Sequence, residues 1–251
     1  MPNNLVKDNL AKCHFIVNIG YNRAMDRVLL DQTFIAFCDL SNAISVQNVS
    51  ETIRAFSGCE LIQEMNGVTM PPPVLQLKDK RKNFLWRIWP NRIDLVRYSP
   101  SNDGVGIDYF VQMFSKLNSP NATRVSVLST EGITTTESFL SKTVAKALNE
   151  TSLPMEFSLR FNFRKPIVEL SGETANCLTY LESGLLNRRS SNGQTDVIPA
   201  LIVRSDTNTI PERSEPRFGN ERLTVVMNSL LELDETSRTK VFDMERMSGE
   251  R

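Results

Sequence analysis

Apolar residues recur at helical spacing in several segments of the chain. The clearest helix follows Asp103, which can cap its first turn, and its apolar positions are Ile107, Phe110, Val111, Phe114 and Leu117. A second helix is expected between Ser50 as its cap and Gly58 as its stop. A capping box at 134–137 predicts a third, ending near residue 149. Apolar positions between 223 and 231, followed by Val241-Phe242, predict closing helices.

Short runs rich in β-branched and aromatic residues predict strands between these helices. Pro90-Asn91 separates two of the runs, which predicts an antiparallel hairpin. The stretch 28–40 is apolar but matches neither the helical nor the strand period, and a polar, mobile loop is expected at 187–193. The predicted strands are 13–19, 74–77, 83–89, 92–98, 124–129, 155–163, 167–170, 177–186 and 200–204.

The order of these elements is strands followed by a helix, repeated twice. Helices with a single apolar face cover one side of a sheet, whereas regular alternation of strand and helix, typical of parallel sheets, is missing. The sequence therefore predicts an α+β fold with antiparallel sheets covered on one side by amphipathic helices. Two similar-sized halves, 1–130 and 131–251, are expected, either as separate units or as one continuous domain.

The composition of the chain points to no particular class of partner. Lys+Arg and Asp+Glu both total 29, so no overall charge steers the chain toward nucleic acid or a membrane. The four cysteines are scattered without a Cys-x-x-Cys pair, and no apolar run reaches the roughly 20 residues that span a bilayer. The expected location is the cytoplasm, with reduced thiols and no membrane partner.

Most familiar catalytic patterns are missing from the sequence. His14 is the one histidine, so a histidine-based metal site is excluded, and neither a P-loop nor a Gly-x-Ser-x-Gly elbow occurs. Gly104-x-Gly106 lacks the third glycine of a dinucleotide-binding turn. Glu169 and Glu173 remain conceivable as a carboxylate pair near a predicted turn. We expect no cofactor, no metal and no standard catalytic residue.

One segment combines positive charge with aromatic residues. Residues 78–97 hold seven basic residues, two acidic residues and both tryptophans. Strand alternation places Trp86 in the core and predicts that Arg87, Arg97 and Trp89 are exposed, a pattern suited to phosphate contact and base stacking. The alternative interpretation of residues 80–82 is a solvated hairpin tip with no binding role. The candidate nucleic-acid or partner-binding residues are Lys80, Arg81, Lys82, Arg87, Trp89, Arg92 and Arg97.

The closing helices offer a further surface. Val225 and Leu233 widen the apolar face beyond what packing on one sheet requires. That wider face is suited either to a partner chain or to a deeper position in the core.

The order of motifs resembles that of a known group of proteins. The hairpin carries Phe84-x-Trp86-x-Ile88-x-Pro90-x-Arg92-Ile93-x-Leu95, and Tyr109-Phe110, Arg124-Val125-x-Val127 and Val241-Phe242 follow in turn. This layout resembles a sporadically distributed, uncharacterised bacterial α+β family of similar length with no known activity. The resemblance implies a bacterial source and a mobile-element or defence context, and it assigns no site residue.

Three hypotheses of function follow. The first is a non-enzymatic binding or regulatory protein acting on a macromolecular partner, either another protein or a second copy of itself. The second is a nucleic-acid-binding module that uses the hairpin 78–97. The third is an enzyme with a non-standard carboxylate or cysteine site.

Overall fold

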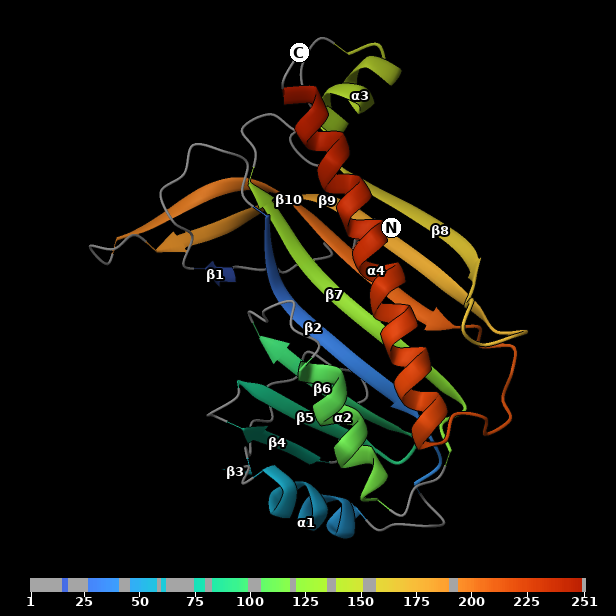
Figure 1. Ribbon diagram of the computed structural model, residues 1–251. Coiled ribbons are helices and arrows are strands. Elements are labelled where there is room, and N and C mark those ends of the chain that lie inside the picture. Colours follow the sequence, from blue (N-terminus) through green and yellow to red (C-terminus); the bar gives the residue numbers. More distant parts are fainter. Residues whose placement is uncertain are drawn as a thin grey trace, which may run out of the picture.

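A computed structural model of the chain describes residues 15–17, 27–40, 46–57, 60–61, 75–79, 83–98, 105–117, 121–134, 139–150, 157–189 and 194–249. Its described strands form one ten-stranded sheet in the order β1-β9-β10-β7-β2-β6-β5-β4-β3, with β8 also paired to β9 (Figure 1). All described strand pairs are antiparallel except β1 with β9. The strands are β1 Phe15–Val17, β2 Arg27–Phe37, β3 Glu60–Leu61, β4 Leu75–Asp79, β5 Phe84–Trp89, β6 Arg92–Tyr98, β7 Arg124–Thr134, β8 Ser158–Pro166, β9 Thr174–Arg189 and β10 Thr195–Thr209.

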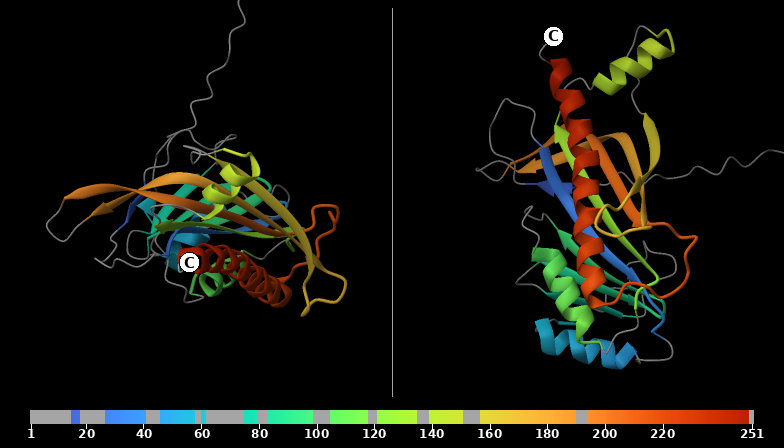
Figure 2. Two further views of the ribbon diagram at one scale, coloured as in Figure 1. Left: turned by 90° about the horizontal axis from the view of Figure 1, so that it is seen from above. Right: turned by 45° about the vertical axis from the view of Figure 1, so that its right-hand side comes forward.

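Three of the four described helices lie against one face of this sheet, while α3 packs against α4. The helices are α1 Val46–Ser57, α2 Val105–Ser115, α3 Phe139–Ala147 and α4 Asn220–Gly249. α1, α2 and α4 lie on the same side, and α4 runs diagonally across β7 and β10 (Figures 1 and 2). The predicted α+β class is therefore confirmed, with a mostly antiparallel sheet as the dominant element.

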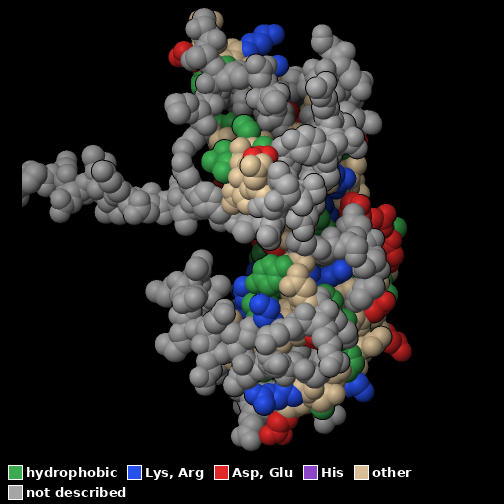
Figure 3. All heavy atoms as spheres, turned by 90° about the vertical axis from the view of Figure 1, so that its left-hand side faces the viewer, with side chains coloured by type: hydrophobic (Ala, Val, Ile, Leu, Met, Phe, Trp, Pro, Cys, Tyr) green, Lys and Arg blue, Asp and Glu red, His purple; other side chains and the backbone are tan. Residues whose placement is uncertain are grey.

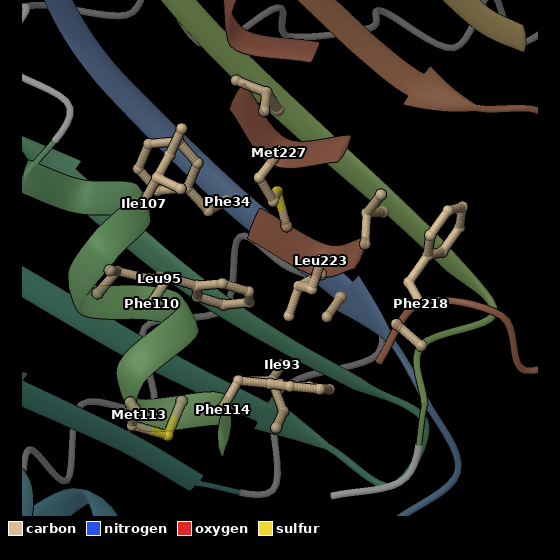
Figure 4. Close-up of a cluster of buried hydrophobic side chains, with 14 of the residues drawn as sticks. Phe34, Ile93, Leu95, Ile107, Phe110, Met113, Phe114, Phe218, Leu223 and Met227 are labelled. Atoms are coloured by element: carbon tan, nitrogen blue, oxygen red, sulfur yellow. The ribbon is translucent and has the colours of Figure 1, made fainter. Parts of the chain in front are cut away.

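The main core fills the space between the sheet and these three helices. Phe110 of α2 packs against Phe34 and stacks on Trp86, with ring centroids 6.5 and 5.8 Å away respectively. Leu223 and Met227 of α4 complete the same cluster (Figure 4). A β-carbon at Gly106 would lie 2.5 Å from both Phe34 and Arg97, so the missing side chain lets α2 approach the sheet. This packing explains Gly106 without a bound dinucleotide.

A buried ionic cluster fixes the middle of α4 to β7. Arg238 is 1% exposed and donates to Asp234 on its own helix at 3.0 Å and to Glu131 of β7. Asp234 also accepts a hydrogen bond of 2.7 Å from the hydroxyl of Ser129. Arg27 of β2 reaches Glu131 as well, and its Nη1 donates to Thr239 of α4 at 2.9 Å. The buried charges between α4 and the sheet are thus paired with one another across β2, β7 and α4.

The structure confirms the predicted hairpin and corrects several boundaries. The hairpin is β5 and β6 around Pro90-Asn91, and the ambiguous stretch 28–40 is mostly β2. α1 begins at Val46, so Ser50 is inside the helix rather than its cap. The closing helices are one helix of 30 residues. The predicted cap at 134 is the last residue of β7, and residues 135–138 lie outside the described residues.

Two predicted segments between β8 and β10 are wrong. Residues 167–170 form the turn between β8 and β9 instead of a strand, with Ile167 N–H bonded to Glu173 O at 3.0 Å and Gly172 at a φ of +80°. In the expected loop at 187–193, residues 187–189 belong to β9 instead, and residues 190–193 lie outside the described residues. The strands pair beyond their apolar centres, since main-chain hydrogen bonds extend the ladder through polar residues.

The sheet is continuous between the two predicted halves. β7 contains residues 130 and 131, and it pairs with β2 on one side and with β10 on the other. The strands therefore belong to one sheet rather than to separate sheets. Among the described helices, none is both long and apolar enough to span a membrane.

Candidate binding surface on the outer face of the sheet

The alternation of side chains divides every strand between two faces. Along β6, Ile93 and Leu95 point into the core beneath the helices, so Arg92 and Asp94 point the other way. We call the face turned away from α1, α2 and α4 the outer face. The candidate surface lies on it, across the strands between β5 and β7.

Four side chains form a continuous row on the outer face. Trp89 of β5 lies opposite Arg92 of β6, Arg92 lies opposite Phe37 of β2, and Phe37 lies opposite Arg124 of β7. The Arg92 guanidinium is 4.6 Å from the Trp89 ring and 5.6 Å from the Phe37 ring, and Arg124 is 5.0 Å from Phe37. We call this set the arginine–aromatic row. Each guanidinium in it gains cation–π attraction from a neighbouring ring.

A buried carboxylate orients the middle of the row. Asp94 is fully buried and accepts two hydrogen bonds from Arg92, of which the bond from Nε is 2.6 Å long. Burial raises the pKa of Asp94, while Arg92 and Arg87 act to lower it. The side chain of Arg92 is still 32% exposed, so it is held firmly and yet remains accessible.

Arg124 within the row and Arg87 beside it offer further hydrogen-bond donors. The Nε of Arg124 is buried and has no hydrogen-bond acceptor among the described residues. Arg87 of β5 lies opposite Asp94 of β6 and is partly exposed. These guanidinium groups supply the planar donor geometry that matches carboxylates and phosphates.

The far end of the outer face repeats the combination of arginine and aromatic ring. Arg160 lies 5.5 Å from the ring of Tyr180, and Arg204 pairs with Glu182 at 2.8 Å. Asp31 of β2 lies in the same region. Burial raises the pKa of Asp31, although a hydrogen bond from Thr130 and the positive charges of Arg204 and Arg87 lower it. Positive and negative side chains therefore alternate across this face.

The predicted binding residues do not all lie together. Arg87 and Arg92 are on the outer face, and Trp89 is there too but only 7% exposed, because Arg92 covers its ring. The expected exposure of Arg97 is wrong: it is 5% exposed on the helix side, where its Nη1 donates to Gln32 at 3.4 Å. Lys80, Arg81 and Lys82 lie outside the described residues.

Sequence reasoning missed half of the arginine–aromatic row. Phe37 and Arg124 are 87 positions apart in the chain and meet through the pairing of β2 with β7. No local pattern announces that pairing. Arg97 was assigned to the wrong face of its strand, since it shares the helix side with Ile93 and Leu95.

The other sequence-based candidates have structural partners. Glu173 is 3% exposed and lies within 3.8 Å of Arg213, Arg217 and Arg222, whereas Glu169 accepts a hydrogen bond from Ser229 at 2.9 Å. In the closing helix, Leu233 packs against the core, while Val225 is 38% exposed. The carboxylates thus have separate neighbours around the start of α4.

The described cysteines are buried. Burial, with a smaller effect of Asp39, raises the pKa of Cys38 to about 12, and burial also raises the pKa of Cys177. Thiols of this kind are poor nucleophiles at neutral pH. Cys13, Cys59 and His14 lie outside the described residues. Within the described ranges, no group of three or more His, Cys, Asp or Glu side chains is placed to hold a metal ion.

Comparison with known proteins adds no relative to this picture. No protein-family model matches the chain, and no curated protein matches it significantly. The argument about function therefore depends on the geometry of the surface itself.

Proposed function

We propose that this chain is a non-enzymatic binding protein that holds a protein partner against the arginine–aromatic row, in a regulatory role in a bacterial cytoplasm. The observation that carries the proposal is the row itself: Arg92 lies between two aromatic rings, is fixed by Asp94 and remains partly exposed. Arginine is one of the residue types that contribute most binding energy at protein interfaces. A mobile-element or defence setting, suggested by the resemblance, belongs to this proposal.

The restraint of the guanidinium groups favours tight recognition. An arginine that is already stacked and ion-paired loses less side-chain entropy on binding than a free surface arginine. The partly exposed guanidinium groups of Arg87 and Arg124 point to acidic groups on the partner. The partner is therefore expected to present carboxylates toward the centre of the outer face.

A nucleic-acid partner is the second candidate, favoured by arginines and aromatic rings on one face of an antiparallel sheet. Two observations weigh against it. Arg92 covers the Trp89 ring, which leaves 7% of that residue accessible for base stacking. Arg92 and Arg204 are also paired with carboxylates. Figure 3, which views the molecule from the left-hand side of Figure 1, shows both acidic and basic side chains among the described residues on that side. Nucleic-acid sites normally present uncompensated positive charge.

The test is an affinity capture of the tagged full-length chain from a bacterial lysate, before and after nuclease treatment. Wild type is compared with the double variant Arg87→Ala/Arg124→Ala and with Arg213→Ala. Arg213 is a matched control, since it is an arginine with a 42% exposed side chain in the segment before α4 and is not part of the row. We expect a protein partner that survives nuclease, is retained by Arg213→Ala, and is reduced about tenfold or more in the double variant, as loss of at least about 1.4 kcal/mol implies.

Two results would overturn the proposal. Equal capture by the double variant would show that the outer face is not the contact surface. Recovery of nucleic acid, with binding that weakens steeply as salt is added, would favour the second candidate.

A further inference from the structure

Among the strands that the structure describes, none pairs with the outer side of the edge strand β8. Ser183 N–H bonds to Phe157 O at 3.1 Å at one end of the β8–β9 ladder, and Ile167 N–H bonds to Glu173 O at 3.0 Å at the other. The register between these ends is continuous. Odd-numbered residues of β8 therefore bond to β9, and the main-chain groups of even-numbered residues point away from it. These outward residues are Ser158, Arg160, Asn162 and Arg164, all of them exposed.

The length of this edge sets it apart within the described sheet. β8 has nine residues, whereas the strands at the two ends of the main strand order, β3 and β1, have two and three. Figure 1 shows β8 along the side of the sheet beside α4. An extended edge with free N–H and C=O groups is a template for an added strand.

The two sides of β8 differ in chemistry. Phe161 and Phe163 point to the helix side and are 40% and 59% exposed, while Leu159 packs into the core cluster beneath the end of α4. Arg160 and Arg164 point to the outer side. An added strand would thus meet aromatic rings on one side and guanidinium groups on the other.

The charge of β8 selects among possible occupants. The strand carries Arg160, Arg164 and Lys165 and contains no acidic residue. A second copy paired antiparallel about Asn162 would place Arg160 opposite Arg164 of its mate, and like charges directly opposite are destabilising. A strand with acidic residues at those positions would be attracted instead.

We infer that the outer edge of β8 accepts an extended segment of another protein, added as a further strand, with acidic residues four positions apart opposite Arg160 and Arg164. The positions between these acids that face Phe161 and Phe163 are apolar. The main-chain hydrogen bonds supply affinity, and the alternation of acid and apolar residue supplies specificity. This surface is separate from the arginine–aromatic row, so each can fail without the other.

The probe is a nine-residue capped peptide that alternates glutamate with valine, labelled for fluorescence anisotropy and titrated with the full-length chain. The control peptide has the same composition with all glutamates before the valines. We expect the alternating peptide to bind at least about tenfold more tightly than the control peptide. Equal binding of both peptides would overturn the inference.

Variants of the chain separate strand addition from simple attraction of charge. Asn162→Pro removes an outward N–H without removing a hydrogen bond to β9, so it is expected to abolish binding and to preserve the circular dichroism spectrum. Arg160→Glu/Arg164→Glu is expected to reject the glutamate peptide and to bind its lysine counterpart. Glu212→Ala frees Arg164 from its salt-bridge partner and is expected to strengthen binding.

Either of two outcomes would contradict strand addition by an acidic partner. Folded Asn162→Pro that binds the peptide as wild type does would show that the main-chain edge is not used. A concentration-dependent dimer of the wild-type chain, lost in Asn162→Pro, would assign the edge to a second copy.

Discussion

The partly buried carboxylate of Asp31, on the outer face, should make the stability of the protein depend on pH. Asp31 accepts a hydrogen bond from Thr130 and feels the positive charges of Arg204 and Arg87, yet burial dominates and raises its pKa above the ordinary value of 3.8. A carboxyl group with a raised pKa in the folded state favours folding below its unfolded pKa. That contribution is lost as the pH rises through the folded pKa. Ionised Asp31 is therefore a cost near neutral pH.

Asp31→Asn is expected to raise the free energy of unfolding near neutral pH. The amide has a similar shape, keeps an acceptor for Thr130 and needs no ionisation in a partly buried site. The advantage over wild type should shrink as the pH falls toward 3.8, because wild-type Asp31 then becomes protonated. Urea unfolding of both proteins across this range measures the difference. A larger advantage at acid pH would contradict the assigned direction of the pKa shift.

At the scale of elements, the position of α4 depends on the buried cluster of Arg238, Asp234 and Glu131. Arg238→Ala leaves two buried carboxylates without their shared partner and is expected to lower the free energy of unfolding by about 3–5 kcal/mol. Lys240→Ala, at an exposed position on the same helix, is the control, with an expected effect within about 0.5 kcal/mol. Urea unfolding monitored by circular dichroism checks both values. Similar stabilities of the two variants would show that the cluster does not anchor the helix.

Elements with strong local signals were the ones that sequence reasoning predicted well. The hairpin of β5 and β6 has a turn residue pair between two β-rich runs, and α2 has an unbroken apolar stripe. α4 was split in prediction, because residues 232–240 are mostly polar and charged and lack such a stripe. The helix continues through this segment because Arg238 donates hydrogen bonds in the interior both to Asp234 and to Glu131. Long-range pairing supplies what local periodicity does not contain.

The candidate surface was predictable to a similar extent. Arg87 and Trp89 were expected on the open face of the hairpin and both lie on the outer face, since alternation along β5 is a local property. Arg92 was a candidate to which no face was assigned. Phe37 and Arg124 were missed because strand order decides which neighbours complete the row. Arg97 shows a different limit: a buried arginine is uncommon, and its place depends on tertiary contacts, among them those with Gln32 and with the Phe84 ring, 5.7 Å away.

At the scale of the whole molecule, the continuous sheet predicts one cooperative unit. β7 joins the two predicted halves, and Leu223 and Met227 of α4 pack in the same core as Phe34 and Phe110. A fragment of residues 1–130 would lose the α4 side of that core and the strand β10 that pairs with β7. We therefore expect this fragment to be unfolded, because exposed apolar core and an unpaired sheet edge remove the driving force for folding.

The full chain is expected to unfold in a single transition. Trp86 and Trp89 both lie in the first half, so their fluorescence reports on that half, whereas far-ultraviolet circular dichroism is sensitive to α4, the longest helix described. Coincident urea midpoints from the two signals would indicate one folding unit. Separate midpoints, or a native-like fluorescence spectrum from fragment 1–130 alone, would mean that the halves fold independently despite their shared sheet. In that case the arginine–aromatic row would belong to the first half alone, since its four residues all lie within 1–130.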